Sequence, residues 1–362
     1  MSVKIIHSAD FHLDSPFDSL PEKKALERRQ EQRALLGSLA DLAESEQADV
    51  VLLSGDLFDS SVCYYETCET LLRVLSSIKA KVFISPGNHD FFCDRSPYAI
   101  LDFPENVHVF RSPVISSVEL PELGCRVYGA AFTSSSSRPL LRGFTAADDG
   151  LVNLMVLHGD LADDRYNLIT RQDIERSGLD YLALGHIHAY SGICSAGSTV
   201  YAYPGCTEGR GFDETGEKGV IAGTVSNSGA DLRFIPLRGR QYRIVQADVA
   251  GSTALAAAEA AISESMKNDV VRVILRGGTD EDIDCTALAE SLADRAYHVT
   301  VRDETHALRD IWDGVSEDTL RGGFLRILRE KYDSADENDK PGILLAVRYG
   351  LAALDNREEW GA

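Results

Sequence analysis

The stretch Val50-Val51-Leu52-Leu53-Ser54-Gly55-Asp56-Leu57-Phe58-Asp59 joins a short apolar run to two aspartates across a glycine. Four consecutive apolar residues that end at a turn residue are typical of a buried strand. The aspartates then stand on the loop after that strand, where the sheet fixes the backbone and the loop presents the side chains. This stretch therefore predicts a strand that leads into a functional loop.

The same layout recurs in further polar segments, each of which follows a predicted strand. They are Asp10-Phe11-His12, Gly87-Asn88-His89-Asp90, His158-Gly159-Asp160 and Gly185-His186-Ile187-His188. A single segment of this kind is more often an ordinary turn, and a single buried histidine is more often a core residue. Here, however, five of the nine histidines of the chain fall in these segments. Together the segments predict a metal site at the strand ends.

The donor types indicate which metals this site would bind. Carboxylate, amide and imidazole donors without a thiolate suit Mn, Fe, Co, Ni or Zn better than Ca or Mg. A carboxylate can bridge two ions, and ions about 3.5–4 Å apart can clamp a phosphoryl group. We therefore expect two divalent metal ions, Mn²⁺ first among them.

Helix and strand signals alternate over the first 110 residues. Apolar residues recur at helical spacing in residues 22–44 and 67–78, between short apolar runs typical of parallel strands. From residue 107 to residue 235 the strand signals dominate. This order predicts an α/β (α+β) domain in which two stacked sheets are flanked by helices.

The pattern changes after residue 240. A small α/β module is predicted next, and two amphipathic helices are predicted over residues 316–332 and 341–354. The expected domains are residues 1–245 for the catalytic part, 246–306 for the small module and 307–362 for the helical region.

The bulk composition bounds the cellular setting. The sequence has no apolar stretch of membrane-spanning length, no signal-peptide pattern at its start and seven cysteines without a Cys-x-x-Cys pair. We therefore expect a cytoplasmic protein with reduced thiols. Its net charge of −21 is the reverse of the basic excess typical of DNA-binding domains. A polyanionic substrate would have to be attracted by local basic features.

In this order, the polar segments resemble those of the calcineurin-like metallophosphoesterases. Residues 55–59, 87–90 and 185–188 look like the SbcD-like DNA repair nuclease branch. The opening Ala9-Asp10-Phe11-His12-Leu13-Asp14-Ser15-Pro16-Phe17 looks closer to the YhaO-type exonuclease-like proteins. The resemblance extends to about residue 245, through Tyr203-Pro204-Gly205 and residues 218–220. It implies a four-layer α/β/β/α sandwich with a small α/β capping module and a C-terminal helix pair.

The resemblance also implies a ligand set, with three ligands for each metal and Asp56 shared between the two. The first metal would be bound by Asp10, His12 and His188, and the second by Asn88, His158 and His186. In such enzymes a hydroxide held between the metals attacks the phosphorus atom in line.

Two further residues receive catalytic roles from the resemblance. His89 would protonate the leaving oxygen or stabilise its charge without binding metal. Asp59 would hydrogen-bond His89 and set its tautomer. Asp90 and Asp160 either orient ligands or serve the fold alone.

The implied function is that of a DNA exonuclease or endonuclease subunit in an SbcCD-like repair complex. The last helices would dock onto an SbcC-like coiled-coil ATPase, and a homodimer is a second possible assembly. Two alternatives stay open from the sequence, a phosphodiesterase for small nucleotides and a non-catalytic repair scaffold. The cluster Arg233, Arg238, Arg240 and Arg243 is equally compatible with phosphate contacts and with a solvated hairpin edge.

Overall fold

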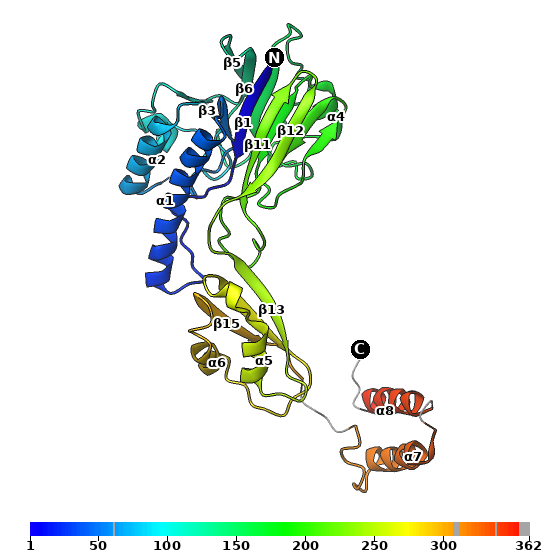
Figure 1. Ribbon diagram of the computed structural model, residues 1–362. Coiled ribbons are helices and arrows are strands. Elements are labelled where there is room, and N and C mark those ends of the chain that lie inside the picture. The colour runs from blue at the N-terminus through cyan, green and yellow to red at the C-terminus, as the bar shows by residue number, and fades with distance from the viewer. Residues whose placement is uncertain (61, 307–310, 337–338, 355–362) are drawn as a thin grey trace. The chain divides into compact units, whose positions relative to one another are not determined.

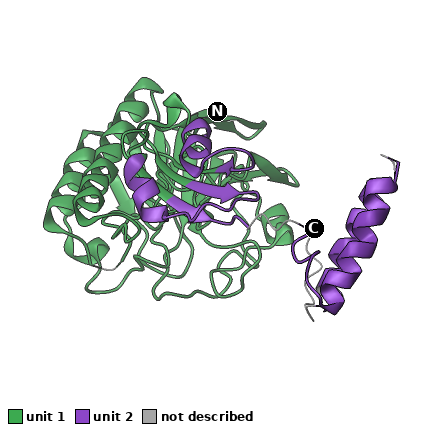
Figure 2. Cartoon of the chain, turned by 90° about the horizontal axis from the view of Figure 1, so that it is seen from below, with its two compact units in different colours: residues 1–245, 262–272, 292–300 green, residues 246–261, 273–291, 301–362 purple. Residues whose placement is uncertain are grey.

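A computed structural model describes residues 1–60, 62–306, 311–336 and 339–354 of the chain (Figure 1). Residues 307–310, 337–338 and 355–362 of the expected C-terminal region lie outside the described residues. The chain forms two compact units (Figure 2). The first comprises residues 1–245, 262–272 and 292–300, and the second comprises residues 246–261, 273–291 and 301–362. The domain boundaries expected from the sequence stay predictions.

The first sheet has six strands in the order β12-β11-β1-β2-β3-β4. They are β1 (Ser2–Ser8), β2 (Val50–Leu53), β3 (Lys81–Ile84), β4 (Val107–Val109), β11 (Gly219–Ser226) and β12 (Gly229–Pro236). The four strands β1 to β4 run parallel. Strand β11 pairs antiparallel with β1, and β12 in turn pairs antiparallel with β11. Helices α1 (Glu22–Ser45) and α2 (Tyr65–Ser77) connect the first three parallel strands.

The second sheet has six strands in the order β5-β6-β7-β8-β10-β9. They are β5 (Ser116–Leu120), β6 (Cys125–Gly129), β7 (Val152–His158), β8 (Tyr181–Gly185), β9 (Cys194–Ala196) and β10 (Thr199–Ala202). Strands β6, β7, β8 and β10 are parallel, and the edge strands β5 and β9 are antiparallel to their neighbours. The short helices α3 (Pro97–Ile100) and α4 (Arg171–Arg176) lie on the connections.

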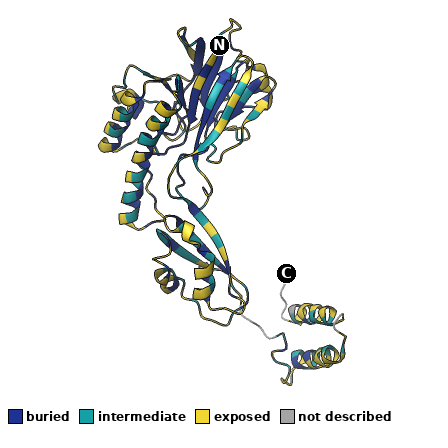
Figure 3. Ribbon diagram, in the orientation of Figure 1, coloured by how far each residue is buried: buried dark blue, intermediate teal, exposed yellow. Residues whose placement is uncertain are grey.

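Alternation along the strands builds the layers. In β2, Val50 and Leu52 face a core shared with strands of the second sheet, whereas Val51 and Leu53 pack with residues of α1 and α2. In β7 the same alternation sends Leu154 and Val156 into the core between the sheets. Its other face packs against a cluster that includes Ile174 of α4. Both faces of the central strands β2, β7 and β8 are thus covered, which explains why these strands are buried along their whole length (Figure 3). The expected four-layer sandwich is therefore confirmed.

A third sheet of order β13-β14-β15 follows. Its strands and helices are β13 (Tyr242–Asp248), β14 (Val270–Arg276), β15 (His298–Asp303), α5 (Ala254–Ala261) and α6 (Cys285–Ser291), with a 3₁₀ turn at Glu264–Met266. Helix α5 ends at Ala261, before this turn.

Helices α7 (Leu320–Ser334) and α8 (Lys340–Leu354) form a hairpin. They share a small apolar cluster centred on Trp312, Leu325 and Val347. In the described part of the chain, no helix combines the length and the apolar character that crossing a membrane requires.

Candidate metal centre

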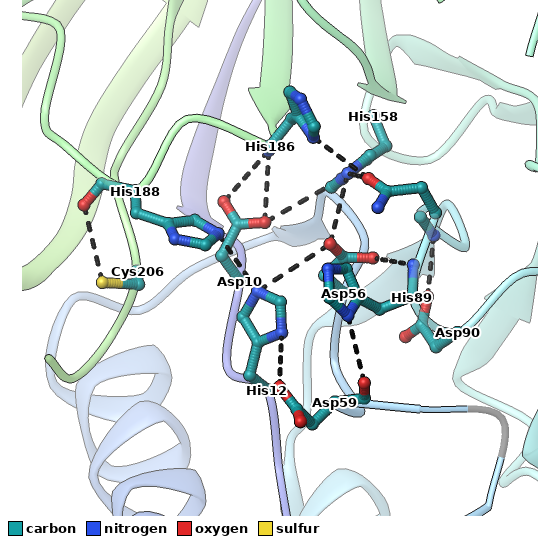
Figure 4. A network of polar contacts seen from close by, with 12 residues as sticks. Asp10, His12, Asp56, Asp59, His89, Asp90, His158, His186, His188 and Cys206 are labelled. Carbon is teal, nitrogen blue, oxygen red and sulfur yellow. Dashed lines mark hydrogen bonds and ion pairs between the residues drawn. The ribbon is translucent and has the colours of Figure 1, made fainter. Parts of the chain in front are cut away.

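The candidate residues come from the loops after five strands. In the first sheet, β1, β2 and β3 are adjacent and parallel, so their carboxyl ends lie at one edge. In the second sheet, β7 and β8 are likewise adjacent and parallel. Figure 4 shows the side chains from these loops gathered around one point. The structure therefore brings together the residues that the sequence analysis selected.

Several of these residues have unusual backbone angles. Asp10, His12 and Asp56 have positive φ values of 52°, 47° and 49°, and His186 has a φ of 111°. Residues other than glycine seldom adopt such angles, and they persist where the surrounding structure imposes them. Here the loops bend sharply at the strand ends and aim the side chains into the centre.

The first group of donor atoms belongs to Asp10, His12 and His188, which all lie within 4.8 Å of one another. The Nε2 atoms of His12 and His188 are 3.1 Å apart. Ligand atoms bound at about 2.1 Å to one ion are separated by about 3.0–3.4 Å in octahedral or tetrahedral geometry. The spacing of these two nitrogens therefore fits a shared metal ion.

The second group is centred on the side-chain oxygen of Asn88. Its Oδ1 atom lies 2.9 Å from Nε2 of His158 and 3.0 Å from Nδ1 of His186. An amide oxygen and two imidazole nitrogens in this arrangement suit a borderline divalent metal.

Asp56 lies between the two groups. Its Oδ2 atom is 3.8 Å from Nε2 of His12 and 3.4 Å from Nε2 of His158. Its other oxygen, Oδ1, accepts a hydrogen bond of 2.9 Å from the backbone N–H of His89. A Cβ atom at Gly87 would come within 2.2 Å of Oδ1, so glycine is required beside this carboxylate.

Burial sets the charge state of the centre. Burial, reinforced by Asp56, raises the pKa of Asp10 well above its usual value. Burial would also raise the pKa of Asp56, but the nearby histidines hold it below its usual range. The pKa values of His12 and His186 fall to about 4, chiefly through burial, so both rings are neutral at pH 7. Neutral imidazoles beside two crowded carboxylates are the forms that bind cations.

Outer contacts orient the histidine rings. Nδ1 of His158 lies 2.9 Å from the carbonyl oxygen of Ser54, which can only accept, so Nδ1 carries the proton. The lone pair is therefore on Nε2, which faces the centre. Nε2 of His186 lies 3.4 Å from Oδ2 of Asp160, on the far side of the ring from Asn88. Contacts of this kind fix the tautomer of metal-binding histidines.

Asp59 contacts His89 through its backbone, and its carboxylate has other partners. Its backbone oxygen lies 3.1 Å from Nδ1 of His89, whereas its carboxylate lies 3.2 Å from Nδ1 of His12 and 2.8 Å from Nη1 of Arg210. The carboxylate contacts the buried imidazole of His12 and the guanidinium of Arg210, and only the backbone of Asp59 faces His89. Asp59 thus contacts His89 through its carbonyl oxygen, and the expectation that it sets the tautomer of this ring stays a prediction.

Asp90 connects two of the loops. Its carboxylate accepts hydrogen bonds from the backbone N–H of Leu57 at 2.7 Å and of Gly87 at 2.8 Å, and from the hydroxyl of Tyr98 at 2.5 Å. The loops after β2 and β3 are thereby tied together. Burial, with the nearby Asp56, raises the pKa of Asp90 to about 7.

The sequence analysis missed Arg210 and Glu214. Oε1 of Glu214 lies 2.7 Å from Nδ1 of His188 and 2.7 Å from Nη2 of Arg210. Burial would raise the pKa of Glu214, but His188 and Arg210 hold it well below its usual range. Both residues lie in the glycine-rich loop between β10 and β11, which resembles an ordinary turn region. The one sequence feature that could have identified them is the spacing of four residues between an arginine and a glutamate in this loop.

Three arginines of the cluster singled out in the sequence are ion-paired. Arg233 pairs with Glu46, Arg240 with Glu31 and Arg243 with Asp269. These pairs neutralise much of the charge that could have met phosphates.

Comparison with known proteins completes this description. A family model described as calcineurin-like phosphoesterase matches residues 3–190. The chain is 32% identical over 243 residues to the uncharacterized metallophosphoesterase YhaO of Bacillus subtilis, with 63% of this chain and 59% of that protein covered. It is 24% identical over 282 residues to the SbcD component of nuclease SbcCD from Staphylococcus epidermidis, covering 68% and 73% respectively.

A third relative is the DNA double-strand break repair protein Mre11 of Saccharolobus solfataricus, 28% identical over 214 residues, with 56% of this chain and 54% of that protein covered. The chain thus spans less than two thirds of the YhaO and Mre11 relatives. The family model extends over more than half of the chain and includes every candidate metal ligand. The chain therefore belongs to the calcineurin-like phosphoesterase family.

Proposed function

We propose that this protein is a two-metal phosphodiesterase that cleaves DNA, as the nuclease subunit of an SbcCD-like complex. The position of Asp56 carries the proposal. One oxygen of this buried carboxylate lies between the two groups of donors, where it could bridge two metals. The names of the SbcCD and Mre11 relatives support DNA as the substrate.

The residues divide between the two proposed ions as they do between the two groups of donors. Asp10, His12 and His188 would bind one ion, and Asn88, His158 and His186 would bind the other. Two bound divalent cations, Mn²⁺ in this proposal, supply an activated water and neutralise phosphate charge. The His89 N–H holds Asp56 in place, and the absence of a side chain at Gly87 leaves space for its Oδ1 atom.

His89 is proposed to assist the leaving group. Its Nδ1 atom faces the Asp59 carbonyl, which only accepts hydrogen bonds, so Nδ1 carries a proton. In the imidazolium form the opposite nitrogen, Nε2, can give its proton to the leaving oxygen. The exposed side chain of His89 stands beside His12, with the ring centroids 4.9 Å apart, so it lies at the open side of the centre.

The C-terminal helix hairpin is the proposed docking site for an SbcC-like ATPase. Leu320 and Ile327 of α7 are 79% and 59% exposed, and Leu345 of α8 is 49% exposed. Apolar side chains at helical spacing suit a helical partner. A homodimer is the other assembly to test, and a cytoplasmic location belongs to the same proposal.

A panel of three substrates tests the proposal. Release of product with Mn²⁺ would be measured from bis-p-nitrophenyl phosphate, linear duplex DNA and 2′,3′-cyclic nucleotides, with Asp56→Asn as the control for contaminating nucleases. We expect cleavage of the first two. Cleavage of cyclic nucleotides in preference to DNA would favour a small-nucleotide phosphodiesterase instead. No turnover of any substrate would favour a non-catalytic scaffold.

A further inference from the structure

Five side chains at the first group of donors form a closed ring of contacts. The Nε2 atoms of His12 and His188 are 3.1 Å apart. On the far side of each imidazole, Nδ1 meets a carboxylate, Asp59 at 3.2 Å and Glu214 at 2.7 Å. The guanidinium of Arg210 closes the ring, at 2.8 Å from Asp59 and 2.7 Å from Glu214.

We propose that Arg210 is a positioning residue for the first metal, a role that rests on the proposed two-metal function. By holding Asp59 and Glu214 at a fixed separation, it orients both imidazoles so that their Nε2 atoms meet at one point. It acts through the two carboxylates and through its own contact with His188, whose Nδ1 atom lies 3.2 Å from Nη2 of Arg210, and it does not itself bind the ion.

The shape of the arginine side chain suits this role. Nη1 of Arg210 contacts Asp59, Nη2 contacts Glu214, and Nε lies 3.3 Å from the second oxygen of Glu214. A planar guanidinium can contact two carboxylates in one rigid geometry, whereas a lysine ammonium is a single point of charge. With 19% of the Arg210 side chain and 7% of the Glu214 side chain exposed, solvent screens these contacts little.

The loop that carries Arg210 is itself held in place. Glu208, two residues earlier, pairs with Arg28, a fully buried residue of α1. Lys218, at the end of the loop, donates a hydrogen bond of 3.0 Å to the backbone oxygen of His188. The backbone N–H of Arg210 donates to Glu214 at 2.8 Å. The guanidinium is therefore presented from an anchored backbone.

The second group of donors has different supports. His158 is held by the backbone oxygen of Ser54, and His186 lies against Asp160. Arg210 contacts neither of these supports among the interactions of the described residues. Its effect is therefore expected at one metal site, which makes the proposal selective.

Calorimetric titration of the metal-free full-length protein with Mn²⁺, in the absence of DNA, tests this selectivity. For Arg210→Gln we expect one of two binding events to weaken by roughly 10–100-fold, as for loss of an outer contact of a ligand, and the other to stay unchanged. Arg210→Lys keeps the charge but cannot contact both carboxylates, so we expect the same loss. Glu214→Gln should weaken the same event, and it carries the test if Arg210→Gln does not fold.

Arg126→Gln is the matched control. Nη2 of Arg126, on β6, also lies between two carboxylates, at 2.6 Å from both Glu119 and Asp149. Its loss removes a comparable ion pair without touching the centre, so both Mn²⁺ affinities should stay at the wild-type level.

Three results would overturn the proposal. The first is unchanged or tighter Mn²⁺ binding in both Arg210 variants. The second is wild-type Mn²⁺ binding in Arg210→Lys, because charge alone would then explain the effect. The third is a raised KM for bis-p-nitrophenyl phosphate with unaltered Mn²⁺ binding. Because the titration contains no DNA, failure of the nuclease proposal would not change its outcome.

Discussion

At the scale of single residues, Asp56 is the side chain on which the centre depends. It is buried beside both groups of donors, and the N–H of His89 fixes one of its oxygens. We expect Asp56→Asn to lose more activity than the roughly 10–100-fold typical of an outer contact, because both metals lose a charged ligand. Metal content and bis-p-nitrophenyl phosphate turnover should fall together. Full metal content in this variant would contradict a bridging role.

His89 gives a second prediction at this scale. If it protonates the leaving oxygen, His89→Ala should retain both metals and lose about 10²–10⁴-fold in turnover of DNA. The loss should be much smaller with p-nitrophenol as the leaving group, because that anion needs little protonation. Because His89 also lies within 4.8 Å of donor atoms of His12 and Asp56, metal analysis is essential. Loss of one metal would make His89 a ligand.

At the scale of elements, the sequence predicted the strands that bury both faces and the loops that follow them. The sequence pattern placed β1, β2, β7 and β8 because most of their residues are apolar. The pattern missed β13, in which apolar and polar residues are mixed and few are buried. It also missed the short edge strand β9. Arg210 and Glu214 were missed for another reason. Their role depends on long-range contacts with Asp59 and His188, and local sequence patterns do not encode such contacts.

His7 of β1 shows how two elements are joined in a pH-dependent way. It is fully buried, with Nδ1 at 2.8 Å from the Tyr181 hydroxyl and Nε2 at 3.2 Å from the Leu184 oxygen, both on β8. Burial lowers the pKa of His7 to about 3. Below the ordinary pKa of about 6.5 the unfolded chain therefore binds a proton that the folded chain does not. The free energy of unfolding should fall as the pH drops from about 6.5 towards about 3.

Urea unfolding in EDTA at several pH values measures this effect. Between about pH 7.5 and 5.5, His7 should account for a loss of about 1.4 kcal/mol of stability. The His7→Gln variant lacks the titrating group, so its stability should fall by that much less over the same range. Other buried histidines contribute equally to both proteins and cancel in the comparison. Parallel pH profiles for the two proteins would show that His7 is not held neutral.

At the scale of the whole molecule, charge is the main constraint on DNA binding. The chain carries a net charge of −21, and Arg233, Arg240 and Arg243 are each paired with an acid. Long-range attraction to a duplex is therefore absent, and binding by the chain alone should be weak and steeply salt-dependent. A partner that supplies basic surface would remove this limit, and the C-terminal helices are its proposed docking site.

Removal of residues 307–362 separates the chemistry from the partner. All candidate ligands lie before residue 189, so the truncated protein should hydrolyse bis-p-nitrophenyl phosphate at the full rate. The apolar cluster of α7 and α8 is built from residues 311–351 alone, so the truncation removes it whole. The truncation also removes the exposed Leu320 and Ile327. Because these residues belong to the proposed docking site, stimulation of DNA cleavage by an SbcC-like ATPase should disappear. Ile327→Glu in the intact chain should give the same loss without deleting the helices, since a charge on the docking face opposes burial. Retention of full ATPase binding by the truncated protein would assign the docking site elsewhere.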